Sequence, residues 1–72
     1  MSDLHPAVSS ILQFFEYEHL PPFLQKVSKK YHDLAHELVE GDLDGPELTV
    51  ALRKLLESKD CAVRAALEPG NE

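Results

Sequence analysis

Apolar residues recur along this chain at intervals of three and four, the spacing that places them on one face of an α-helix. The pattern occurs in three separate stretches and predicts helices at about residues 4–17, 22–40 and 46–67. Each predicted helix has a proline near its start, where the fixed φ and the missing N–H are tolerated: Pro6, Pro22 and Pro46. The pattern therefore predicts an all-α fold.

The second and third predicted helices each carry a continuous apolar face. The second face contains Leu24, Val27, Tyr31, Leu34, Ala35 and Leu38, and the third Leu48, Ala51, Leu52, Leu55, Ala62, Val63 and Ala66. Because the connection at residues 41–45 is short, we expect these helices to be antiparallel neighbours. The predicted architecture is a short N-terminal helix followed by a long antiparallel helical hairpin. Phe14 lies off the apolar face of the first helix, so it packs either on its own chain or on another subunit.

The length bounds the organisation of the protein. Its 72 residues form a single predicted domain, 1–72, with a loose tail at 68–72. A chain of this size buries only roughly 60% of its unfolded surface, so we expect an oligomer. The single cysteine, Cys61, cannot form an internal disulfide, and no apolar run approaches a membrane span. We therefore expect a cytoplasmic protein with no membrane contact.

Charge is distributed unevenly along the chain. The net charge of −6 disfavours the binding of long nucleic acid, which depends on many phosphate contacts. Residues 33–52 carry six carboxylates and no lysine or arginine, whereas all seven basic residues lie within 26–30 and 53–64. The basic side chains expected to meet at the open end of the hairpin are Lys26, Lys30, Lys59 and Arg64.

A loop with an aromatic ring, a histidine and two prolines is expected at the same end. Cations and helix-start N–H groups hold phosphates, and a ring face stacks on a base. The candidates for binding a phosphate-bearing, base-containing ligand are Tyr17, His19, Lys26, Lys29 and Lys30 in and after this loop, together with Lys59 and Arg64 at the open end of the hairpin. The alternative is that Lys26 and Lys29 are solvated, with Lys29 four residues before Asp33, and that Tyr17 is a packed ring with its hydroxyl at the surface.

Lys59 is unusual because it falls on the apolar face of the third predicted helix. One interpretation is that its side chain extends to water at the open end or pairs with Glu16 or Glu18. The other is that it faces a seam between chains, where an anionic ligand or a partner carboxylate neutralises it.

His32 and His36 are one helical turn apart, a spacing that metal ligands use. No third ligand is fixed by the pattern, so surface histidines are favoured and no metal is predicted. Cys61 has no identifiable catalytic partner, and the chain has no Gly-rich phosphate loop, nucleophile elbow or paired-carboxylate site. We therefore predict no catalytic residues, no cofactor and no enzymatic activity.

The loop and the helices after it resemble a family of small bacteriophage proteins. The resemblance consists of Phe15-x-Tyr17-x-His19-Leu20-Pro21, then Leu24-Gln25, Leu34-Ala35, Gly45-Pro46-Glu47 and the run Ala51–Ala66. The matching segments span about residues 12–67. The family that they resemble comprises the anti-CBASS cyclic-oligonucleotide sponges and the related hairpin of Thoeris anti-defence proteins.

The resemblance implies immune evasion by sequestration in the host bacterial cytoplasm. Members of this family assemble into dimers and hexamers and bind cyclic dinucleotides between subunits without cleaving them, and some also bind trinucleotides. Tyr17 and His19 match the family's aromatic loop, and the ligand-contacting lysine corresponds to Lys26, Lys29 or Lys30. Many relatives have an arginine-tyrosine pair where this chain has Ser28-Lys29, which leaves the identity of the nucleotide open. The competing interpretation is a small oligomeric phage protein-interaction module with no nucleotide ligand.

Overall fold

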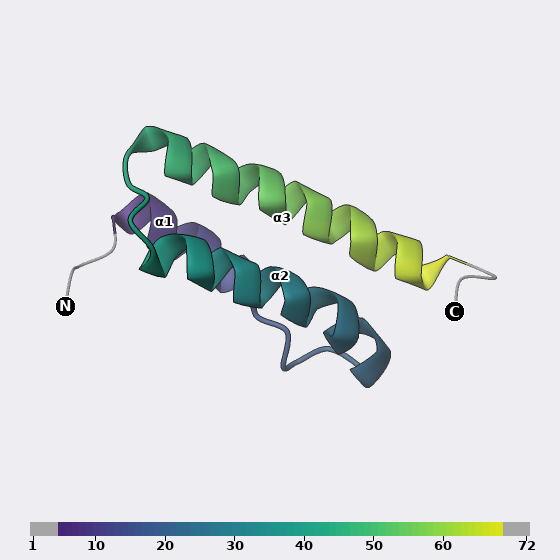
Figure 1. The fold of residues 1–72 in the computed structure, drawn as a ribbon. Coiled ribbons are helices and arrows are strands. Elements are labelled where there is room, and N and C mark those ends of the chain that lie inside the picture. The colour runs from purple at the N-terminus through teal and green to yellow at the C-terminus, as the bar shows by residue number, and fades with distance from the viewer. Residues whose placement is uncertain (1–4, 69–72) are drawn as a thin grey trace.

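The computed structural model describes residues 5–68, and every regular element within them is helical (Figure 1). In chain order these elements are α1 (Pro6–Leu12), the single 3-10 turn η1 (Gln13–Phe15), α2 (Pro22–Glu40) and α3 (Pro46–Leu67). The all-α prediction is confirmed for the described residues. Residue 4, where the first helix is predicted to begin, and residues 69–72 of the predicted tail lie outside them.

The first helix is shorter than the sequence predicts. Its α-helical part ends at Leu12, the 3-10 turn follows, and Glu16 is already extended, so Tyr17 lies in a loop. The physical reason is the position of Phe15, which is fully buried in the core. Once this ring is buried, the chain must turn toward the start of α2, and Pro21 holds the residue before it out of the α region.

Local features explain where the helices begin. The His5 ring caps α1, because its Nδ1 accepts a hydrogen bond of 3.1 Å from the backbone N–H of Ala7. At the start of α2, Gln25 Nε2 donates to the backbone oxygen of Leu20 at 2.8 Å and so attaches the loop to the helix. Gly45 precedes α3 with a φ of 90°, a conformation that side chains rarely adopt.

Helices α2 and α3 lie side by side and run in opposite directions, and α1 lies behind them in Figure 1. Near the middle of the pair the hydroxyls of Tyr31 and Ser58 are 3.1 Å apart. The core joins all three helices and contains Val8, Ile11, Leu12, Phe15, Ala35, Leu48 and Leu52. Helix α1 packs on one side of the α2–α3 pair. Because α1 is short, it covers only the half of that side nearest the 41–45 turn (Figure 1).

The molecule is elongated, with principal extents of 43 × 20 × 17 Å. Among the described residues, none of the helices combines the length and apolar character needed to cross a bilayer.

Candidate functional site

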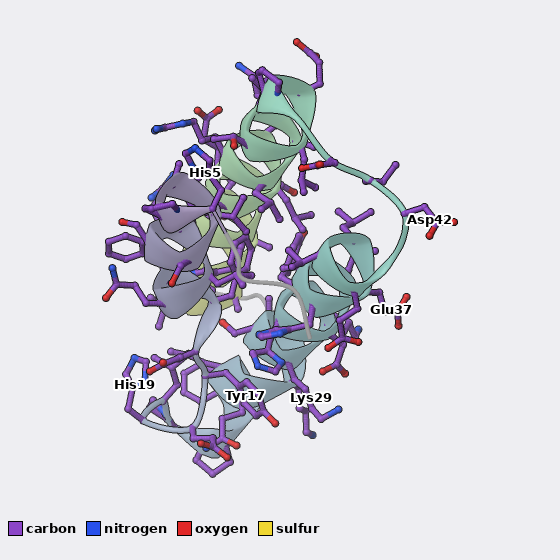
Figure 2. The ribbon with its side chains drawn as sticks, turned by 90° about the vertical axis from the view of Figure 1, so that its left-hand side faces the viewer. His5, Tyr17, His19, Lys29, Glu37 and Asp42 are labelled. Carbon is purple, nitrogen blue, oxygen red and sulfur yellow. The ribbon has the colours of Figure 1, made fainter. Side chains whose placement is uncertain are left out.

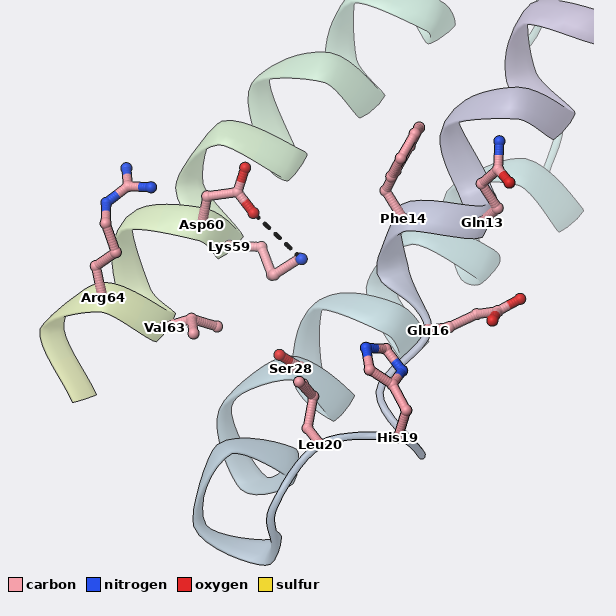
Figure 3. Close-up of a pocket in the computed structure, with 10 residues that line it drawn as sticks. All are labelled: Gln13, Phe14, Glu16, His19, Leu20, Ser28, Lys59, Asp60, Val63 and Arg64. Atoms are coloured by element: carbon pink, nitrogen blue, oxygen red, sulfur yellow. Dashed lines mark ion pairs between the residues drawn. The ribbon is translucent and has the colours of Figure 1, made fainter. Parts of the chain in front are cut away.

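A pocket of about 510 Å³ lies between η1 and the loop that follows it, the first turns of α2 and the C-terminal half of α3. The ten residues that line it are drawn in Figure 3. Its volume falls within the roughly 300 to 1,000 Å³ typical of small-molecule sites. The pocket therefore lies at the end of the molecule where the sequence places the basic residues and the histidine loop.

Lys59 is the central cation of this pocket. Its side chain is only 14% exposed, and Nζ lies 3.2 Å from Oδ1 of Asp60 (Figure 3). Asp60 is its one ion-pair partner among the described residues, and no ion pair joins it to Glu16 or Glu18. Since an ammonium group has three donors, one carboxylate leaves hydrogen-bonding capacity directed at the pocket.

Ser28 lines the same pocket from α2. The residue is completely buried, and within the described part of the chain its Oγ has no hydrogen-bond partner. Leaving a buried hydroxyl unpaired costs about 1–3 kcal/mol, so such groups in folded proteins normally have a partner. A ligand or a water molecule in the pocket would supply one.

His19 and Arg64 stand at the exposed rim. His19 comes from the loop, and its ring lies beside the pocket in Figure 3. Arg64 comes from α3, and its guanidinium is directed away from the pocket, where Nη2 lies 3.4 Å from Cys61 Sγ. Because the Arg64 side chain is exposed and unbranched, a change of rotamer can bring its charge to a bound anion.

Acidic groups also line the pocket, namely Asp60 beside Lys59 and Glu16 on the opposite wall. The lining is therefore mixed in charge rather than uniformly basic. Such a pocket suits a ligand with few negative charges and several neutral hydrogen-bonding groups, whereas a polyphosphate would be repelled by the two carboxylates.

Tyr17 and Lys29 lie in a second cluster (Figure 2). The Tyr17 ring packs edge-on against His32 at a centroid distance of 5.1 Å, and His36 lies 4.4 Å beyond His32. Lys29 Nζ donates to Asp33 Oδ2 at 2.8 Å. This hydrogen bond, with the attraction between the charges, raises the pKa of Lys29, and the hydrogen bonds from Lys29 and His32 lower the pKa of Asp33.

The structure thus divides the seven residues that the sequence nominates. Three of them line the pocket: His19, Lys59 and Arg64. Tyr17 and Lys29 belong to the second cluster, and Lys26 and Lys30 are exposed on α2 outside the pocket lining.

Sequence reasoning missed several pocket residues, of which Ser28 is the most informative. A signal was present, because Ser28 follows Leu24 by four positions and precedes Ala35 by seven, and both are buried. A serine at that spacing lies on the inner side of a helix.

The paired histidines make no metal centre with their neighbours. Across residues 5–68, no group of three or more histidine, cysteine, aspartate or glutamate side chains is placed to hold a metal ion. The rings of His32 and His36, whose planes are tilted by 43°, instead line a separate surface hollow together with Glu16 and Glu18.

Comparison of the chain with protein-family models, with curated proteins and with solved structures found no match. The resemblance to phage proteins therefore stays a prediction.

Proposed function

We propose that the protein binds a small phosphate-bearing ligand in the Lys59 pocket and holds it without cleaving it. The ligand class that the resemblance implies is a cyclic oligonucleotide immune signal, a cyclic dinucleotide or a related trinucleotide, which the protein would sequester on behalf of a phage. The observation that carries the proposal is the Lys59 ammonium, 14% exposed and with one carboxylate partner, in a pocket of about 510 Å³.

The pocket contains complementary groups for each part of such a ligand. The Lys59 ammonium and the Ser28 hydroxyl would donate to phosphate oxygens, which relieves the unpaired state of Ser28 Oγ. Phe14, 56% exposed, and His19 offer ring faces at the rim on which a base can stack. A cyclic nucleotide has few charges for its size, in keeping with the mixed lining.

Holding rather than cleaving fits the lining. A serine nucleophile needs an adjacent base within hydrogen-bond reach, and Ser28 Oγ has no partner among the described residues. The proposal includes contact of the ligand with a neighbouring subunit, as the resemblance implies. A second chain at the rim would cover Phe14 and complete the enclosure.

The test is a thermal-shift panel of cyclic dinucleotides, cyclic trinucleotides and cyclic ADP-ribose isomers. At a ligand concentration a hundredfold above Kd, binding stabilises the folded protein by about 2.7 kcal/mol. Each mixture is then heat-denatured, and the nucleotide is identified by chromatography. We expect at least one nucleotide to raise Tm and to be recovered intact. No shift with any of them overturns the ligand class, and a cleaved nucleotide overturns sequestration.

The variant Lys59→Met tests whether the nucleotide binds in the Lys59 pocket. It removes a charge-assisted hydrogen bond and should lower affinity about tenfold or more. Lys54→Met is the matched control, because Lys54 is an exposed lysine of the same helix outside the pocket lining. Equal affinities of the two variants would mean that the nucleotide binds elsewhere.

One observation favours the competing interpretation of a protein-interaction module. Phe14, Phe23 and Leu34 are each more than two-fifths exposed, at 56%, 52% and 43%. This second function would be supported if no nucleotide in the panel raised the Tm of the protein and the protein captured a defined partner protein.

A further inference from the structure

A second hollow, of about 300 Å³, lies in the groove between α1 and α3, and we call it the Arg53 hollow. Phe14 of η1 and Asp60 of α3 line both this hollow and the Lys59 pocket, so the two adjoin at this pair of side chains. Figure 3 shows the Phe14 ring beside the Lys59 ammonium, on the side where α3 continues toward its N-terminal half. The groove therefore extends past Phe14 from the Lys59 pocket into the Arg53 hollow.

Arg53 is the cation of this second hollow. Its side chain is exposed, and among residues 5–68 its guanidinium takes part in no ion pair and no side-chain hydrogen bond. Glu57 follows Arg53 by four positions, which is the spacing of a helical ion pair, yet these two side chains are not paired. A guanidinium presents five N–H donors in a planar arrangement that matches two oxygens of a phosphate. Arg53 can therefore offer all of these donors to an anion in the hollow.

The rest of the lining suits the uncharged part of a nucleotide. Ile11 is buried, and Leu56 packs against the core, so both give the Arg53 hollow an apolar wall. The Phe14 ring is more than half exposed, which leaves a face free for a base to stack on. A mostly apolar surface with a few placed polar groups is the usual composition of a small-molecule site.

The two cations are separated along α3. Arg53 and Lys59 are six positions apart, about 9 Å along the helix axis. Asp60 lines both hollows, so a carboxylate lies where they meet. A diphosphate would concentrate its charge at one cation and beside this carboxylate, which repels it. A ligand with two separate, singly charged phosphodiester groups can instead place one group at each cation.

We propose that the Arg53 hollow is a second anion subsite of the Lys59 pocket. One chain then holds a ligand with at least two separate phosphodiester groups, one at Lys59 and one at Arg53, and a base of that ligand stacks on Phe14. The inference rests on the proposed function for the phosphate at Lys59. It adds a second phosphate contact from the same chain, and it requires a ligand with more than one phosphodiester.

Calorimetric or NMR titration of the full chain with two sets of probes tests the inference. The first set is the cyclic di- and trinucleotides of the thermal-shift panel, and the second is 3′,5′-cyclic AMP and 3′,5′-cyclic GMP, which have one phosphodiester each. We expect at least one member of the first set to bind about tenfold or more tightly than both mononucleotides, because it gains the charge-assisted contact with Arg53. Equal affinities overturn the second subsite. No binding by the first set also overturns it, whatever other members of the panel bind.

The variant Arg53→Met separates this inference from the proposed function. It should weaken binding of the first set about tenfold or more and leave the mononucleotides unaffected, whereas Lys59→Met should weaken both sets. The matched control is Lys54→Met, because Lys54 is the next residue of α3, exposed and outside the lining of both hollows. An Arg53→Met variant that binds like this control overturns the second subsite alone. A Lys59→Met variant that binds like the control overturns the proposed pocket.

Phe14→Leu tests the stacking contact, since it removes the ring and keeps an apolar side chain. We expect it to weaken binding of the first set about fivefold or more. Circular dichroism checks that each variant keeps its helical content. A Phe14→Leu variant with the affinity of the wild type overturns the stacking of a base on Phe14.

Discussion

Replacement of Ser28 by alanine should stabilise the protein, which is the opposite of what most substitutions of buried residues do. Ser28 is fully buried, and its Oγ has no hydrogen-bond partner among the described residues. Removal of the hydroxyl removes a desolvation cost of about 1–3 kcal/mol, and alanine exceeds serine in helix propensity by about 0.5 kcal/mol. The lost atom leaves a small void that offsets part of the gain. The net increase in the free energy of unfolding should be about 1–2 kcal/mol.

The assay is thermal and urea unfolding followed by circular dichroism. All samples need the same chain concentration, because self-association stabilises the folded state by mass action. A gain of 1 kcal/mol raises Tm by about 4–8 °C in a domain of 60–100 residues. Ser9→Ala is the control. Ser9 is an exposed serine of α1, so its replacement changes helix propensity alone and should add about 0.5 kcal/mol or less.

A Ser28→Ala variant that is no more stable than Ser9→Ala would refute the reasoning, because it would mean that Oγ has a partner such as a bound water. The same variant links stability to function. If Ser28 donates to the ligand, alanine should also lower affinity for whichever nucleotide shifts the wild type. Greater stability together with weaker binding is the behaviour expected of a polar group retained for a ligand.

Two further predictions concern the turn and the surface ion pair. Gly45→Ala should lower the free energy of unfolding by about 1–3 kcal/mol in urea titrations, because φ there is 90°; Gly41→Ala, whose added Cβ would meet Glu37 O at 3.4 Å, should change it little. The pKa of Asp33 in an NMR titration should lie below 3.8 and return toward that value in Lys29→Met, because the Lys29 hydrogen bond favours the carboxylate. The Lys29–Asp33 pair therefore stabilises the folded state above pH 3.8, and this stabilisation is lost as the pH falls through the lowered pKa of Asp33. An unchanged Asp33 pKa in Lys29→Met would contradict this prediction.

Much of the helical framework can be predicted from the sequence. Helix α2 begins at Pro22 and α3 at Pro46, as the apolar spacing and the prolines indicate. These are local signals, because a proline at the first helical position and a run of residues three and four apart depend on no distant contact. The end of α1 could not be predicted in this way. It depends on the burial of Phe15 against α2 and α3, which is a tertiary contact.

In the candidate site, too, some features could be predicted from the sequence and others depended on tertiary contacts. Lys59 is conspicuous in the sequence because a cation on an apolar face is rare, and it lies at the centre of the pocket. The sequence could not decide that Tyr17 packs on His32 while His19 lies at the pocket. Both residues share one loop, and local pattern does not fix how that loop crosses α2.

The role of Ser28 was also decided by tertiary structure. Helical spacing places Ser28 on the inner side of α2, but whether its hydroxyl finds a partner depends on the groups that face it. The sequence by itself therefore determined the all-helical character, the starts of α2 and α3, and one unusual lysine. Which side chains meet that lysine depends on how α2 is rotated about its own axis. Packing against α1 and α3 sets this rotation, and no local sequence signal predicts it.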